Sequence, residues 1–207
     1  SLAGVGLTDA DYNVALGYGA LNNDQLGSKT VAIGTEALQQ QVFDSATDSL
    51  NTAVGYNAGK QVTTGIYNTF IGGRAGDNIG DADFNVAVGT DALTADSTGS
   101  KSTAVGYQAL RLQNFSSATD SYNTAIGYQA GTQVTTAQEN TLIGNSAGTA
   151  LTVGNTNTAV GSFALLGETK GDRNVAIGRG ALQSQNNTSS TDVYNVAVGY
   201  AAGNALT

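Results

Sequence analysis

The sequence contains no cysteine, histidine, proline, methionine or tryptophan, and these absences exclude several classes of protein. Without cysteine there can be no disulfide framework, thiol nucleophile or thiolate metal site. Without histidine or cysteine, no Ser–His or Cys–His catalytic pair can form, so we expect no enzyme, no catalytic residue and no cofactor. A glycan-cleaving fibre that uses two carboxylates remains as a minor alternative, because that chemistry needs neither residue.

The sequence also has few charged residues. Asp, Glu, Lys and Arg together make up 12% of the chain, and the formal net charge is −8. The basic residues are scattered along the chain, which argues against binding to the phosphates of nucleic acid. No uninterrupted apolar stretch is long enough to cross a bilayer, so we expect no direct membrane insertion by this segment. The acidic, Gly- and Thr-rich composition favours an exposed protein.

What the sequence does contain is a unit of the form Asn, Val or Thr, Ala, an aliphatic residue and Gly, which recurs eleven times. Its glycines are 17 or 21 residues apart, and three gaps of 17 with one of 21 give a longer period of 72 residues. Self-similarity at a fixed period indicates a solenoid. We therefore expect one repeat domain over residues 1–207, all-β, with about eleven coils and one coil per repeat.

The glycine of each unit is expected to supply a positive φ at a tight corner, or to let a neighbouring backbone come close. On this interpretation, Gly127→Val should be far more damaging than Asp96→Ala. The corner glycines are Gly17, Gly34, Gly55, Gly72, Gly89, Gly106, Gly127, Gly144, Gly161, Gly178 and Gly199.

The segment before each glycine is predicted to be a strand. In the unit that ends at Gly178, Val175 and Ile177 share one face of the strand and Ala176 faces the other way. β-Branched residues at these positions favour a strand over a helix. We expect the Val, Ile and Leu column to be stacked inside the solenoid. The residue four after each glycine alternates between Leu and Gly in pairs, which predicts layers filled by leucines and layers closed by backbone.

Nine of the eleven units begin with Asn. If the units stack at the spacing of strands, about 4.8 Å, these amides can hydrogen-bond to one another along the stack. We therefore interpret the column as a structural ladder, with glycan contact as the alternative. The ladder consists of Asn13, Asn51, Asn68, Asn85, Asn123, Asn140, Asn157, Asn174 and Asn195.

All nine tyrosines fall at two positions of the unit. One position precedes the Asn and holds Tyr12, Tyr67, Tyr122 and Tyr194, with Phe84 in the same place. The other follows the corner glycine and is our candidate binding face, with Tyr18, Tyr56, Tyr107, Tyr128 and Tyr200. The alternative is that both columns only stack on one another and cover apolar edges.

Two weaker patterns are interpreted as structural. The run from Asp77 to Asp83 looks faintly like a calcium loop, but it lacks the twelfth-position Glu, so we expect a solvated acidic loop and no metal site. Thr at the first strand position of six units suggests an ice-binding array, but Val interrupts it in the other five.

The units Asn13–Gly17, Asn174–Gly178 and Asn195–Gly199 resemble the head repeats of YadA-like trimeric autotransporter adhesins. The same motif occurs in phage tail-fibre proteins, and the resemblance covers essentially the whole chain. It implies a left-handed parallel β-roll with three chains wound side by side as a homotrimer. The chain departs from the family in its longer units, and in having Thr30 and Ser102 at the Asn position.

We therefore predict an adhesive surface-fibre segment whose loops attach to a host protein or glycan. The three longer polar segments, residues 39–50, 111–122 and 183–194, should lie on one face, which in repeat proteins is often the binding face. We expect a location at the bacterial cell surface or outer membrane, or in a virion fibre. Neither end carries the polar cap of a free-standing solenoid, which predicts a piece of a longer fibre. The alternative is a passive filament, able to join end to end, or a tail-fibre shaft without its own receptor site.

Overall fold

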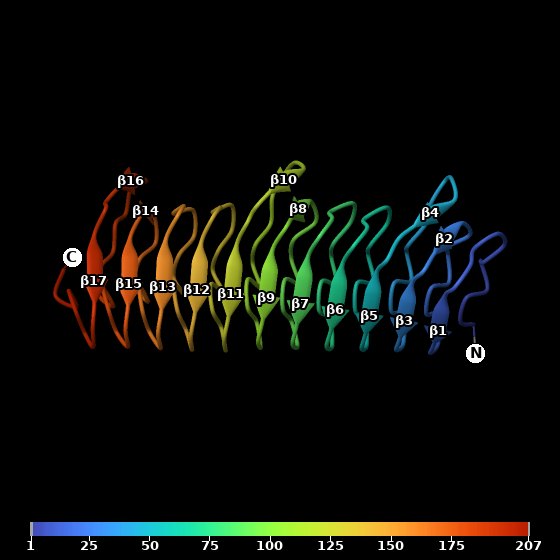
Figure 1. The fold of residues 1–207 in the computed structure, drawn as a ribbon, viewed down its shortest axis with the longest axis horizontal. Coiled ribbons are helices and arrows are strands. Elements are labelled where there is room, and N and C mark those ends of the chain that lie inside the picture. The colour runs from blue at the N-terminus through green and yellow to red at the C-terminus, as the bar shows by residue number, and fades with distance from the viewer. Residues whose placement is uncertain (1, 207) are drawn as a thin grey trace.

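The eleven Asn-to-Gly segments form eleven short strands, which pair in parallel into one continuous sheet (Figure 1). A computed structural model describes residues 2–206, and this part of the chain contains strands and turns but no helix. Along the sheet the strands are β1 (Val14–Leu16), β3 (Val31–Ile33), β5 (Thr52–Val54), β6 (Thr69–Ile71), β7 (Val86–Val88), β9 (Thr103–Val105), β11 (Thr124–Ile126), β12 (Thr141–Ile143), β13 (Thr158–Val160), β15 (Val175–Ile177) and β17 (Val196–Val198). Thr52 pairs with Thr69, and Thr69 with Val86, so the chain advances one layer per repeat. The predicted β-solenoid is confirmed.

Each 21-residue unit adds a pair of two-residue strands away from the main sheet. These pairs are β2 (Gly27–Ser28) with β4 (Thr47–Asp48), β8 (Gly99–Ser100) with β10 (Thr119–Asp120), and β14 (Gly171–Asp172) with β16 (Thr191–Asp192). In Figure 1 the three insertions rise on the same side of the rod, above the neighbouring coils.

The face of the strands that lines the interior is the opposite of the one we expected. In β15 the middle residue, Ala176, is fully buried, whereas Val175 and Ile177 lie on the outer face. The middle residue is Ala in the other strands too, except for Phe70 and Leu142. The prediction of β-branched side chains stacked inside is therefore wrong. The interior is narrow, because the sheet faces a second row of buried alanines three residues after each corner glycine.

Two kinds of layer fill this interior. Where the residue four after the corner glycine is Leu, that leucine is fully buried, as predicted: Leu21, Leu38, Leu93, Leu110, Leu165 and Leu182. The layers with Gly at that position are not closed by backbone, as we expected, but are filled by a larger strand residue. A Cβ added to Gly59 or Gly76 would lie under 3.0 Å from the ring of Phe70. Large and small residues thus complement one another across the coil.

All eleven corner glycines have a positive φ, between +124° and +142°. From Gly17 to Gly178, a Cβ added at any of these corners would lie under 3.0 Å from the backbone of the next corner glycine. At Gly199 the nearest atom to an added Cβ is the Ala202 Cβ, at 4.0 Å. Except at Gly199, the corner therefore needs glycine for two reasons: the backbone conformation and the approach of the next layer.

The asparagines join neighbouring coils, but not through the amide-to-amide ladder that we expected. The Oδ1 atom of Asn51 accepts the backbone N–H of Asn68 at 2.9 Å, and its Nδ2 donates to the carbonyl of Gly65 at 2.7 Å. The same two bonds to the next coil are made by Asn13, Asn68, Asn85, Asn123, Asn140 and Asn157. Bonds between two amides of the column occur, within residues 2–206, only from Asn140 to Asn123 and from Asn174 to Asn157. The amides mainly satisfy buried backbone groups, which would otherwise lack partners.

At the 21-residue gaps a glutamine makes the connection. Gln41 Nε2 donates to Thr30 Oγ1 at 3.1 Å, and Gln41 Oε1 accepts from Asn51 Nδ2 at 2.9 Å. Gln113 bridges Ser102 and Asn123 in the same way, at 2.7 and 2.9 Å. The two units that lack Asn therefore still have a polar link to the next layer.

Each of these glutamines also binds a buried carboxylate one coil earlier. Asp96 has no exposed surface; its Oδ2 accepts from Gln113 at 2.6 Å, and its Oδ1 from the Gly99 N–H at 2.9 Å. Asp24 and Glu168, one long period away on either side, are also fully buried. The choice of Asp96→Ala as a mild substitution was wrong, because the change would leave two buried donors without an acceptor.

Glu168 is held as a carboxylate by the donors around it. Its Oε1 accepts from the N–H groups of Gly171 and Asn187 at 2.7 and 3.0 Å, and its Oε2 from Gln185 at 2.8 Å. Burial alone would raise the pKa of Glu168, but the bonds from Gln185, Asn187 and Gly171 outweigh it, so the pKa is lowered. The stabilisation from Glu168 is therefore present above the unfolded-state pKa of Glu, about 4.3, and is lost as the pH falls through the folded-state pKa.

Candidate functional site

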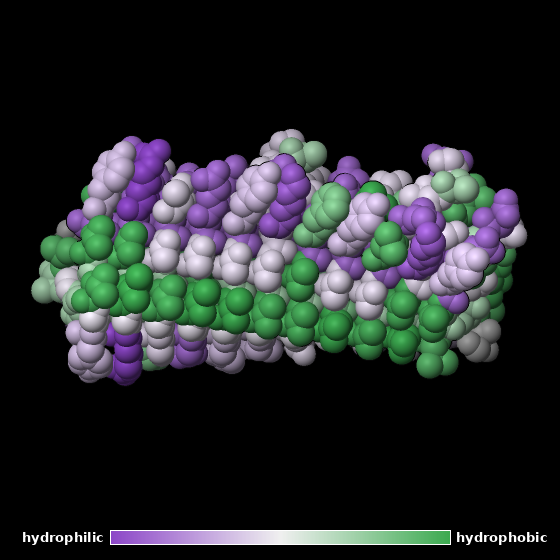
Figure 2. All heavy atoms as spheres, in the orientation of Figure 1, coloured by the Kyte–Doolittle hydropathy of each residue, from purple (hydrophilic) through white to green (hydrophobic). Residues whose placement is uncertain are grey.

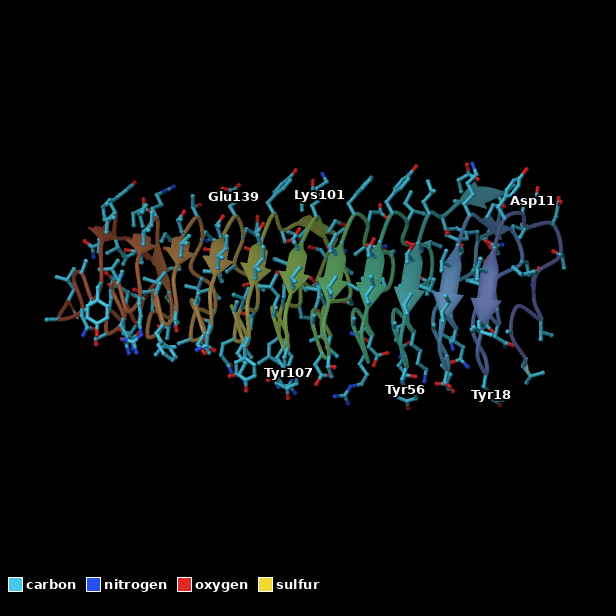
Figure 3. All side chains as sticks on the ribbon, turned by 60° about the horizontal axis from the view of Figure 1, so that its bottom comes forward. Asp11, Tyr18, Tyr56, Lys101, Tyr107 and Glu139 are labelled. Carbon is cyan, nitrogen blue, oxygen red and sulfur yellow. The ribbon has the colours of Figure 1, made fainter. Side chains whose placement is uncertain are left out.

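The tyrosines that follow the corner glycines lie on the surface along one edge of the rod, and Tyr18, Tyr56 and Tyr107 are labelled in Figure 3. Their side chains are between 41% and 76% exposed. Tyr107 and Tyr128 are in adjacent coils and stack, with ring centroids 5.4 Å apart and planes at 19°. Tyr18 and Tyr56 are separated by the coil that carries Thr35. The candidate face is thus accessible but interrupted.

The column that precedes the Asn position is also exposed, and it alternates between aromatic and charged residues. Tyr67 and Phe84 stack at 4.9 Å with planes at 9°. The Lys101 ammonium lies 5.2 Å from the ring centroid of Tyr122, a cation–π distance. The backbone is left-handed here, with φ of 59° at Tyr67 and 63° at Lys101.

A surface ion pair accompanies each inserted loop. Lys101 Nζ lies 2.5 Å from Asp120 Oδ2. Lys29 with Asp48, and Arg173 with Asp192, are the equivalent pairs one long period before and after. The hydrogen bond with Asp120 raises the pKa of Lys101, and the same bond lowers the pKa of Asp120. Exposed pairs of this kind add little stability.

The outer face of the eleven-stranded sheet forms a continuous apolar band along the rod (Figure 2). Each strand contributes a Val or Thr and then a Val, Ile or Leu. Ile71, Ile126 and Ile177 in the middle layers are 38–41% exposed. Soluble monomers rarely expose contiguous apolar patches larger than a few hundred Å². This surface was missed at the sequence level, because the β-branched column was assigned to the interior.

A hollow of about 460 Å³ lies at the foot of the middle insertion. It is lined by Asp81, Ala82, Asp83, Thr98, Ser100, Ala118, Thr119 and Asp120. These residues come from three successive layers, and β8 pairs with β10 so that Ser100 lies beside Asp120. The 72-residue period could indicate where the insertions lie, but not that one of them rises as a wall beside the preceding coils.

Burial raises the pKa of Asp83, and the charge of Asp81 raises it further, while the hydrogen bond from the Ile66 N–H opposes the shift. No group of three or more acidic side chains within residues 2–206 is placed to hold a metal ion. The acidic run at Asp77 therefore shows no calcium geometry. None of the described residues belongs to a helix long and apolar enough to cross a membrane.

Comparisons with protein families, with characterised proteins and with solved structures gave no match. The resemblance of the repeat to YadA-like adhesin heads therefore stays a prediction. Function must be argued from the surfaces of the rod, since a solenoid fold by itself does not imply one.

Proposed function

We propose that this chain is a segment of an extracellular fibre, in which copies associate side by side and present the tyrosine column and the inserted loops to a surface partner. The apolar outer face of the main sheet carries the proposal. It runs through all eleven layers, about 50 Å at strand spacing, and no charged side chain interrupts it. Association would remove this face from water, at roughly 25 cal/mol for each Å² of apolar area buried.

The proposed assembly is a homotrimer. Three rods with their sheets turned toward a common axis would bury all three apolar bands, while the tyrosines and loops remain outside. The resemblance to trimeric adhesin heads supports the number three. A multivalent array of weak contacts on such a rod would bind a surface by avidity.

The double variant Ile71→Lys with Ile126→Lys is expected to be monomeric, whereas the unchanged protein should have three times the mass of one chain. Two lysines per copy would bring charges into the apolar contact, where they cannot be paired. Size-exclusion chromatography with light scattering measures the mass. Val42→Lys is the control, because Val42 is similarly exposed but lies on an inserted loop. A monomeric unchanged protein at micromolar concentration would overturn the assembly.

Attachment is tested separately on arrays of glycans and cell-surface proteins. We expect binding to be lost when Tyr18, Tyr56 and Tyr128 are replaced by Ala, because aromatic rings supply much of the energy in such contacts. Alanine at Tyr12, Tyr67 and Tyr194, in the other column, is the matched control. If the unchanged protein binds nothing on either array, the passive filament is the better description.

A further inference from the structure

The hollow beside the middle insertion has unused hydrogen-bonding groups. Ser100 Oγ accepts the backbone N–H of Asp83 at 3.0 Å, but its own proton has no acceptor within residues 2–206. Asp83 Oδ1 accepts the Ile66 N–H at 2.8 Å, and its Oδ2 has no partner in the same part of the chain. Asp81 is exposed, and neither of its carboxylate oxygens has a partner among the described residues.

The other polar groups of the hollow are already engaged. Asp120 pairs with Lys101 and accepts the hydroxyl of Tyr122 at 3.1 Å. Thr98 and Thr119 donate to carbonyls of the inserted loop, at 2.8 and 2.9 Å. The groups left for a ligand are thus one hydroxyl donor and three carboxylate oxygens, above walls of alanine and threonine methyl groups.

We propose that this hollow binds a neutral, hydroxyl-rich ligand, a carbohydrate. Neighbouring hydroxyls of a sugar ring can donate to Asp81 and Asp83 and accept from Ser100, which satisfies both kinds of free group at once. Hydrogen bonds to a charged carboxylate are stronger than those between neutral groups. The volume of about 460 Å³ is in the usual range for a small-molecule site. The site is separate from the tyrosine column and from the sheet face, so it goes beyond the function proposed above.

The long period supplies variants that the fold accepts. Asn155 is the equivalent of Asp83, and its Oδ1 accepts the Gln138 N–H at 2.8 Å, as Asp83 does from Ile66. Val153 stands at the place of Asp81. The double variant Asp81→Asn with Asp83→Asn therefore keeps the structural hydrogen bond and removes the two charges.

The test measures binding of maltohexaose, cellohexaose and mannohexaose to the full chain, by saturation-transfer NMR and isothermal titration. At least one of them should bind, and the double variant should bind it about tenfold more weakly or worse, since it loses charged acceptors. Glu139→Gln with Asp44→Asn is the control, because it also removes two exposed carboxylates but leaves the hollow unchanged. An unchanged melting temperature would show that the double variant is folded.

Three results would overturn the proposal: no binding of any of the three hexasaccharides, equal binding by the double variant, or equal weakening by the control. Binding of spermine or Ca²⁺ at this place without sugar binding would also overturn it, in favour of a cation site. Each of these results leaves the mass measurement and the tyrosine variants unaffected, so failure here is distinguishable from failure of the proposed function.

Discussion

Replacing Gly127 by Val is expected to lower the free energy of unfolding by more than about 4 kcal/mol. Gly127 has a φ of +141°, a conformation that β-branched residues rarely adopt. A Cβ at this corner would also lie under 3.0 Å from the carbonyl oxygen of Gly144. The next layer cannot move away, because Gly144 is packed against Gly161 in the same manner. Urea unfolding followed by circular dichroism would measure the loss.

Three alanine variants separate the two causes. Gly73→Ala should be nearly neutral, because no atom lies within 4 Å of its added Cβ and its φ is not positive. Gly199→Ala should show the cost of backbone conformation alone, since its φ is +128° but the space beside it is open. Gly127→Ala should cost most, because it adds the contact with the next layer. If Gly127→Ala were as mild as Gly73→Ala, the corner assignment would be wrong.

Replacing Phe70 by Ala should cost about 3–5 kcal/mol, because Phe70 is the largest fully buried side chain and its removal leaves a cavity. The cost should fall when Gly76 is changed at the same time. In the unchanged protein, Gly76→Ala would place a Cβ under 3.0 Å from the Phe70 ring, whereas in the Phe70→Ala background the new methyl group enters the cavity.

A double-mutant cycle with Phe70→Ala and Gly76→Ala measures this complementarity. We expect a favourable coupling of about 1 kcal/mol or more between the two positions, read from the shift of the urea midpoint. The φ of +59° at Gly76 is tolerable for a side chain, since Leu38 and Leu93 adopt +48° and +50° at the equivalent position. Additive effects would contradict the exchange of large and small residues across the coil.

Most of the fold follows from the spacing of glycines, because one layer per repeat is the arrangement that brings equivalent glycines into register. The orientation of the strands did not follow. Alternation distinguishes two faces but does not say which is inside, and Val175 with Ile177 was the more hydrophobic choice over Ala176. The recurring alanines were the missed signal, since they mark an interior too narrow for larger side chains in most layers.

The polar interior was less predictable than the apolar one. Asp96 and Gln113 are 17 residues apart, so their equivalence could be read from the period, but polar residues are usually assigned to the surface. Their burial depends on donors such as the Gly99 N–H, which only the folded coil supplies. The hollow at Asp83 was unpredictable for a similar reason, because it is bounded by three separate layers.

The hydrogen bonds between layers run along the length of the rod, which determines how it would respond to force. A chain pulled by one end would strain the outermost layer first, while the inner layers keep both neighbours. Each coil of 17 residues released from the end would lengthen the tether by about 55 Å, compared with a layer thickness of about 4.8 Å. A fibre built this way would yield stepwise from its tip under load, dissipating work while its shaft stays intact.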